Sequence, residues 1–232
     1  MNFLQELLFL IIAYKLFPVV QTVIDDGVSL ADKTTYAHNK VRYLHAVQDM
    51  VWDQELADNS KAWADLLASE NSLHHSEGSK MGMYGENLYK GFDGFKNEKT
   101  VADAVYNWYI EIEGYNFNDP APDLDIHGHF TALVWRTTIR VGCAITSREL
   151  YGGLFTFIVC QYLPSGNVNG FFLSNVMQLR FGATIPRHPR ELEAPIGCID
   201  RFENCNMWTG VCGQTTFRTM MVQYCKKTCQ IC

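Results

Sequence analysis

The spacing of apolar residues predicts three amphipathic helices in the first half of the chain. From Thr34 to Met50 the apolar residues recur every three or four positions, which is the helical repeat. Asp53 and Thr100 stand directly before two further segments of this kind and are typical N-caps. Glu111 lies at the edge of the third apolar stripe, so we expect its carboxylate to face the protein body or a cleft.

Short runs of β-branched and aromatic residues predict strands in the second half. These runs are Thr131–Trp135, Arg140–Ile145 and Phe155–Cys160. Gly152 and Gly153 separate the last two runs and favour an antiparallel hairpin. A hairpin centred between Tyr151 and Gly152 sets Cys143 opposite Cys160, close enough for a disulfide. Two buried free thiols are the alternative.

The N-terminal segment is apolar but short. Leu7–Ala13 is followed by Lys15 and Pro18, whereas a membrane-spanning helix needs roughly 20 apolar residues. We expect residues 1–22 to be a secretory signal peptide, which places the protein outside the cell. A buried N-terminal helix and a signal anchor are the alternatives.

Composition narrows the class of protein. Hydrophobic residues make up 47% of the chain and charged residues 19%, which indicates a globular protein with a core. The 232 residues allow one ordinary domain and a small module. A net charge of −6 argues against nucleic acid as a partner, because phosphate binding needs clustered Lys and Arg.

Cysteines concentrate at the C-terminus, after a proline-containing segment. Residues 176–197 carry mixed charges and three prolines, which predicts a semi-extended linker. Residues 198–232 then hold six of the eight cysteines. So short a segment needs cross-links to fold, and disulfides contribute roughly 2–4 kcal/mol each. Zinc-finger spacing and histidine are missing from it, so we expect disulfides and an oxidising compartment. The spacing alone leaves the pairing open.

Four short stretches, in order, resemble the CAP superfamily of cysteine-rich secretory proteins, antigen 5 and plant pathogenesis-related proteins. They are His38–Arg42, Gly85–Leu88, Gly128–Trp135 and Phe157–Asn167. The resemblance implies a CAP (SCP) domain over residues 30–175. Its implied fold is α+β, a three-layer α-β-α sandwich with a small antiparallel sheet between helical layers. In this family the His38–Arg42 stretch is mainly structural.

The tail, residues 198–232, resembles ShK-type toxin domains in its cysteine spacing and its two ends. The resemblance implies a small disulfide-rich helical module. It also implies three disulfides: Cys198–Cys232, Cys205–Cys225 and Cys212–Cys229. Channel-blocking members carry Lys-Tyr shortly before the fourth cysteine, where this chain has Thr219 and Met220. Simple pore block is therefore not expected, although Arg218, Lys226 and Lys227 make the tail mildly positive.

The CAP resemblance further implies a cleft lined by two imidazoles and two carboxylates. Motif contexts assign them to His75, Glu86, Glu111 and His129 rather than to the neighbouring His74 and His127. Mixed nitrogen and oxygen ligands suit zinc or copper better than calcium or magnesium. We expect a divalent metal, zinc in particular, and no organic cofactor. A purely structural hydrogen-bonded cluster is the alternative.

No catalytic residue is predicted. The chain has neither a His-Glu-x-x-His helix nor a Gly-x-Ser-x-Gly elbow. Ser76 follows His75 directly, which does not supply the geometry of a nucleophile and its base. Zinc-dependent hydrolysis at the cleft is the enzymatic alternative to a non-enzyme.

These interpretations together predict a secreted binding protein. We expect the CAP domain to hold a metal or an apolar ligand and the tail to reach an extracellular or membrane-protein target. Sterol or lipid is one ligand class that the family implies, although the loop of residues 115–126 is acidic and has no aromatic residue after Phe117. The alternative function is an ion-channel modulator or venom-like toxin component acting through the ShK-type tail.

Overall fold

The computed structural model describes residues 27–119 and 121–195, together with residues 205, 209, 210, 212, 228 and 229. The signal peptide expected at residues 1–22 lies outside this part of the chain, as do Cys198, Cys225 and Cys232. The elements, in chain order, are α2 (Leu30–Leu44), β1 (Val51–Trp52), α3 (Gln54–Glu70), α4 (Glu77–Lys80), β2 (Gly85–Asp93), α5 (Val101–Tyr109), η1 (Ile110–Ile112), α6 (Leu124–Val134), β3 (Arg140–Leu150), β4 (Gly153–Leu163), α7 (Phe172–Asn175) and η2 (Pro189–Leu192).

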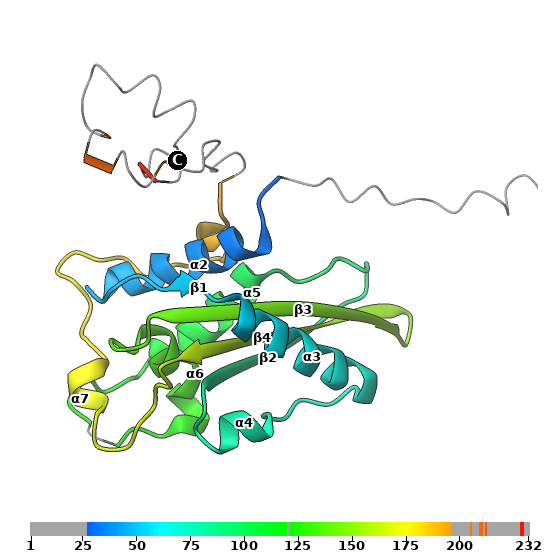
Figure 1. Ribbon diagram of the computed structural model, residues 1–232, viewed down its shortest axis with the longest axis horizontal. Helices are drawn as coiled ribbons and strands as arrows, with labels where there is room; N and C mark the ends of the chain where they lie inside the picture. The colour runs from blue at the N-terminus through cyan, green and yellow to red at the C-terminus, as the bar shows by residue number, and fades with distance from the viewer. Residues whose placement is uncertain are drawn as a thin grey trace, which may run out of the picture.

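A four-stranded sheet forms the middle layer, in the order β1-β3-β4-β2 (Figure 1). β1 runs parallel to β3, whereas β3 and β2 both pair antiparallel with β4. Leu150 pairs with Gly153 across a turn formed by Tyr151 and Gly152, as the hairpin prediction required. Cys143 and Cys160 are register partners and form a disulfide. β2 was not predicted from the apolar pattern.

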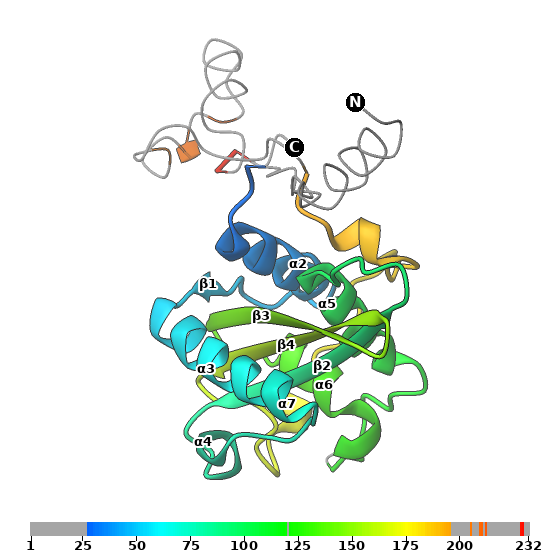
Figure 2. The same cartoon turned by 90° about the vertical axis from the view of Figure 1, so that its right-hand side faces the viewer.

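The sheet is covered by helices on both faces, which makes three layers (Figures 1 and 2). Alternate residues of β4 face opposite sides, as the two-residue period of a strand requires. Phe157 and Val159 pack with α3, whereas Ile158 and Tyr162 pack with α2, α5 and α6. The α+β sandwich expected from the sequence is therefore the fold of this chain.

Two of the three predicted helices begin at the N-cap residue that the sequence indicated. The Asp53 side chain accepts a hydrogen bond from the Leu56 N–H at 3.1 Å. Thr100 and Asp103 form a reciprocal capping box. The helix predicted over 34–50 instead spans Leu30–Leu44, because the Ser29 side chain caps it earlier and the chain turns away after it.

The strand predicted at residues 131–135 is wrong, because these residues end α6. Asp123 caps this helix at the Asp125 N–H, and the Thr131 hydroxyl donates back to the carbonyls of His127 and Gly128. Phe130 and the residues after it are buried on every side. An apolar run of this length carries no periodicity that could separate a buried helix from a buried strand.

The segment predicted as a linker at 176–197 packs against the body as far as it is described. Leu192, in η2, is 1% exposed and belongs to the main core. The Arg180 N–H donates to the Leu44 carbonyl, and the Tyr106 hydroxyl donates to the Arg187 carbonyl. The His45 ring also donates a hydrogen bond to the Met177 carbonyl. Scattered hydrogen bonds and a few apolar residues separated by prolines hold this segment, which explains why it shows no helical or strand periodicity.

Further along, Cys212 and Cys229 form a disulfide, and Cys205 is also disulfide-bonded. The first is one of the pairs that the ShK-type resemblance implied; the pairs that include Cys198, Cys225 or Cys232 involve residues outside the described part. Over the described residues, no helix combines the length and the apolar content that crossing a bilayer demands.

Candidate functional site

An open cavity of about 610 Å³ lies between α4, the start of β2, α6 and the loop of residues 165–168. His75, Glu86 and His129 line it, so segments separated by more than fifty residues in sequence meet at one hollow. Glu111 does not line the cavity, but its carboxylate lies directly behind His129.

His75 and Glu86 form the first half of the site. His75 Nδ1 donates to Glu86 Oε1 at 2.9 Å. The His75 side chain is 47% exposed, whereas that of Glu86 is fully buried. The imidazole is therefore presented to the cavity by a carboxylate that solvent does not reach.

Glu86 is fully engaged by donors. Besides His75, it accepts hydrogen bonds from the Ser76 N–H at 2.9 Å, the Ser76 hydroxyl at 2.8 Å and Gln161 Nε2 at 3.0 Å. Burial by itself would raise the pKa of Glu86, but these hydrogen bonds together hold that pKa below its usual value. The carboxylate is thus ionised at neutral pH, and both its oxygens are occupied.

His129 and Glu111 form the second half in the same manner. His129 Nδ1 donates to Glu111 Oε1 at 2.6 Å. Glu111 Oε2 accepts from the backbone N–H groups of His129 and Phe130, at 2.9 and 3.1 Å. Glu111 belongs to η1, and His129 lies in α6 with its ring stacked near Trp108. The prediction that Glu111 faces inward is confirmed by these contacts.

Each pair fixes the tautomer of its imidazole. An ionised carboxylate only accepts hydrogen bonds, so Nδ1 carries the proton and, in the neutral ring, Nε2 holds a lone pair. Neither Nε2 has a hydrogen-bond partner within the described part of the chain. Both rings belong to residues that line the cavity, so their Nε2 atoms are the candidate ligand atoms of the site.

The two carboxylates are hydrogen-bonded to the Nδ1 atoms of the imidazoles. They do not form a metal site of four ligands together with them. Among the described residues, no three of His75, Glu86, Glu111 and His129 bring ligand atoms within 4.8 Å of one another. The structure thus brings the four side chains to one site but divides them into two His-carboxylate pairs.

The neighbouring histidines have other partners. His74 Nε2 lies 3.0 Å from Glu70 Oε2, and the His74 ring packs edge-on against Trp63. His127 Nδ1 lies 2.6 Å from the Glu111 carbonyl oxygen, and the ring packs edge-on against Tyr115. Neither residue lines the cavity.

Ser76 is used structurally. Its hydroxyl donates to Glu86, lies 3.2 Å from the Tyr84 hydroxyl and accepts from the Ser79 N–H as the cap of α4. Ser76 therefore orients Glu86. The sequence missed this role and that of Gln161, although Gln161 stands inside the 157–167 stretch that resembles the family.

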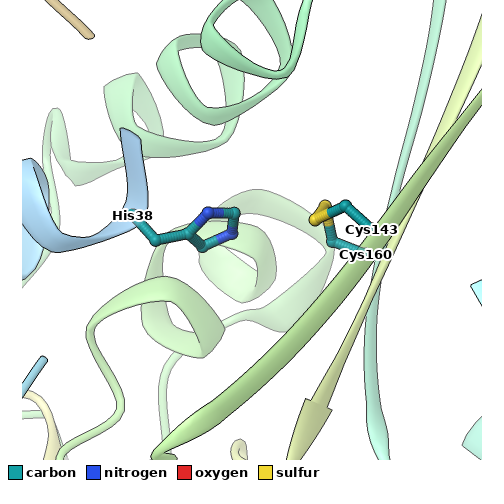
Figure 3. A group of neighbouring side chains, drawn as sticks. All are labelled: His38, Cys143 and Cys160. Carbon is teal, nitrogen blue, oxygen red and sulfur yellow. A yellow bond between two sulfur atoms is a disulfide. The ribbon is translucent and has the colours of Figure 1, made fainter. Parts of the chain in front are cut away.

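A second group of potential ligands lies in the core. The ligand atoms of His38, Cys143 and Cys160 lie within 4.8 Å of one another (Figure 3). The two sulfurs are bonded to each other, so neither is a thiolate able to bind zinc. His38 Nδ1 donates to the Thr34 carbonyl and Nε2 accepts from the Tyr162 hydroxyl. This group is a packed part of the core.

Comparison with known proteins agrees with the fold and the motifs. Residues 35–162 match the cysteine-rich secretory protein family, and residues 197–232 match the ShK domain-like family. The chain is 38% identical over 144 residues to Golgi-associated plant pathogenesis-related protein 1 of Homo sapiens, covering 61% of this chain and 88% of that protein. It is 36% identical over 136 residues to Secreted protein RBT4 of Candida albicans, covering 58% of this chain and only 34% of that protein.

A solved structure, NaASP2 with Zn2+, shares this fold. It matches with a TM-score of 0.50 and 23% sequence identity, covering 67% of this chain and 90% of that one. The fold, the motifs and the matched residues agree with one another: this chain belongs to the cysteine-rich secretory protein (CAP) family and carries a C-terminal ShK-like domain.

Proposed function

We propose that this protein is a secreted, non-enzymatic binding protein that holds a divalent metal, zinc in particular, at His75 and His129. The observation that carries the proposal is the pair of imidazoles at one cavity, each oriented through Nδ1 by a carboxylate. Histidines that bind metals usually donate their other ring N–H in this way, which fixes the ring and raises the basicity of the ligand nitrogen.

The donor set fits a borderline metal ion. Imidazole nitrogen suits zinc, copper and nickel, whereas calcium and magnesium prefer oxygen ligands. The oxygens of Glu86 and Glu111 already accept hydrogen bonds, so they are not free to build an oxygen cage. His75 and His129 would supply the ligands, and a bound zinc would act there as a Lewis acid with positions open to outside donors.

Binding is favoured over catalysis by the way the candidate nucleophile is used. The Ser76 hydroxyl gives its hydrogen to Glu86, and no histidine accepts from it among the described residues. A serine nucleophile requires a base that takes this proton. Zinc-dependent hydrolysis would instead need a base for a zinc-bound water, and the oxygens of Glu86 and Glu111 already accept other hydrogen bonds.

Secretion and targeting complete the proposal. The apolar N-terminal run, the disulfides and the kinship with a protein named as secreted support export. We assign the ShK-like tail the role of reaching an extracellular or membrane-protein target. An ion channel is the target class that its mild positive charge favours.

Isothermal titration calorimetry with zinc chloride tests the proposal. We expect the full chain to bind zinc at one site, and the double variant His75→Ala/His129→Ala to lose that site. His74→Ala is the matched control: it removes an exposed neighbouring imidazole that does not line the cavity, and its titration should equal that of the wild type. Zinc binding by the double variant at wild-type affinity would contradict the proposal.

A further inference from the structure

The cavity is much larger than a metal ion requires. Its volume is about 610 Å³, whereas a water molecule occupies roughly 30 Å³ in the liquid. Pockets for small organic ligands span roughly 300–1,000 Å³. A zinc ion held by two imidazoles also keeps about two of its four usual positions for outside donors. Both facts leave room for a ligand beside the metal.

Two exposed apolar side chains line the cavity, and two more stand next to a lining residue in the sequence. Met81 and Met83 flank the lining residue Gly82 and are 69% and 63% exposed. Leu124 and Val168 line the cavity and are exposed as well. Single exposed apolar residues are ordinary, but a group of them around a hollow marks a binding surface. Exposed methionines are flexible and polarizable, and they recur at surfaces that bind peptides.

Gly128 offers an independent sign of an occupant. It lies inside α6, next to His129, and it lines the cavity. Its φ is not in the left-handed region, and an added Cβ would lie 3.5 Å from the Leu124 Cβ, an ordinary contact. Neither backbone nor packing requires glycine here, although glycine destabilises a helix interior relative to alanine. The missing side chain keeps the cavity wall open beside the imidazole.

Charge and polarity indicate the class of occupant. Lys80 lines the cavity, and its partner Glu77 is highly exposed, so that ion pair is weak and the ammonium can engage a ligand carboxylate. Ser79, Ser165 and Asp125 also line the walls. These groups can hydrogen-bond the N–H and C=O groups of a peptide, whereas a fatty acyl chain offers them nothing beyond its head group.

We propose that this cavity binds a short apolar peptide segment bearing a carboxylate side chain. The carboxylate lies toward His75, His129 and Lys80, and the flanking apolar side chains lie on Met81, Met83, Leu124 and Val168. Gly128 makes the room for the peptide backbone and determines which ligands enter. This inference rests on the proposed metal site, because a bound zinc supplies part of the attraction for the carboxylate.

The test begins by loading the full chain with zinc and measuring that affinity. The probe is acetyl-Leu-Leu-Glu-Leu-amide, its matched control is the same peptide with Gln in place of Glu, and octanoate stands for an acyl-chain ligand. We expect the Glu peptide to bind at least tenfold more tightly than the Gln peptide or octanoate, by calorimetry. Equal affinity for the two peptides, or tighter binding of octanoate, would overturn the inference.

Variants separate the peptide site from the metal site. Gly128→Ala should weaken the Glu peptide at least fivefold while zinc affinity is unchanged and the melting temperature is equal or higher. Met81→Ser/Met83→Ser should weaken it as well, whereas Phe95→Ser, an exposed residue beyond the opposite end of β2, should not. If zinc does not bind at all, the proposed function fails with the inference; if zinc binds and Gly128→Ala binds the peptide normally, the inference alone fails.

Discussion

His38 and His45 are both buried and both held as the neutral imidazole by two hydrogen bonds. In each, Nδ1 donates to a backbone carbonyl, of Thr34 or Met177, and Nε2 accepts from a tyrosine hydroxyl. The pKa of each histidine is lowered to about 4, mainly by burial and also by the Arg42 charge, against the opposing effect of the backbone hydrogen bond. Both rings therefore stay uncharged through the physiological range.

This predicts acid sensitivity in a defined window. The folded pKa of about 4 lies below the ordinary value of 6.5, so the unfolded chain takes up protons first as the pH falls. The stabilising contribution is complete above pH 6.5 and is lost down to about pH 4, on the order of 3 kcal/mol for each histidine. Urea unfolding with EDTA present, at pH 7.5 and 4.5, measures this loss in the free energy of unfolding.

His45→Gln should reduce the loss by about half, because glutamine keeps a donor and an acceptor but does not titrate. Glu86 affects this comparison little, since its pKa is lowered and its contribution is lost mainly as the pH falls below its ordinary value of 4.5. A variant as acid-sensitive as the wild type would show that other groups cause the loss.

A substitution of Glu111 tests whether this carboxylate orients the imidazole that binds the metal. If it orients His129 through Nδ1, Glu111→Gln should keep the fold but weaken zinc binding by roughly 10–100-fold. Glu113→Gln removes a charge two residues away on an exposed side chain and serves as the matched control. Calorimetric zinc titrations of the two variants make the comparison, and equal affinities would mean that Glu111 is only structural.

Among the elements, α2 is tied to the end of α6 by one side chain. Arg42 is fully buried and donates to the carbonyls of Leu133, Trp135 and Thr138, as well as to that of Gln48. Burial lowers the pKa of Arg42 to about 10, which still leaves it charged at neutral pH. The guanidinium satisfies the carbonyls at the C-terminal end of α6, beyond which the chain turns into β3.

Arg42→Met should therefore destabilise the protein strongly. It leaves several buried carbonyls without a donor, and we expect a loss on the order of 3–5 kcal/mol in the free energy of unfolding. Lys40→Met, on the exposed face of the same helix, should change it by well under 1 kcal/mol. Urea unfolding at pH 7.5 compares the two; similar small losses would mean that water replaces the guanidinium.

At the scale of the whole molecule, the family resemblance predicted the three layers, whereas the local patterns predicted only some of the elements within them. Helix caps at Asp53 and Thr100 and the Cys143–Cys160 register depend on neighbouring residues, so local patterns reveal them. Residues 131–135, which include the end of α6, were predicted as a strand because complete burial removes periodicity. The sequence pattern also could not show that the proline-containing segment around Leu192 packs on the core.

At the site, too, the sequence motifs identified the residues but not the hydrogen bonds between residues far apart in the chain. The resemblance named His75, Glu86, Glu111 and His129; in the structure three of them line one cavity, and Glu111 lies behind His129. Glu86 is also held by Ser76, the N-cap of α4, and by Gln161 in β4, whereas Glu111 is held by backbone N–H groups of α6. Such long-range hydrogen bonds decide which atoms stay free, and no spacing in the sequence encodes them.

The most direct measurement of the central claim is an anomalous difference map, at the zinc absorption edge, from crystals of the full chain grown with zinc chloride. We predict one strong peak in the cavity, bound by Nε2 of His75 and Nε2 of His129, with Glu86 and Glu111 still hydrogen-bonded to the Nδ1 atoms. An empty cavity at saturating zinc, or a zinc bound by the two carboxylates instead, would contradict the account.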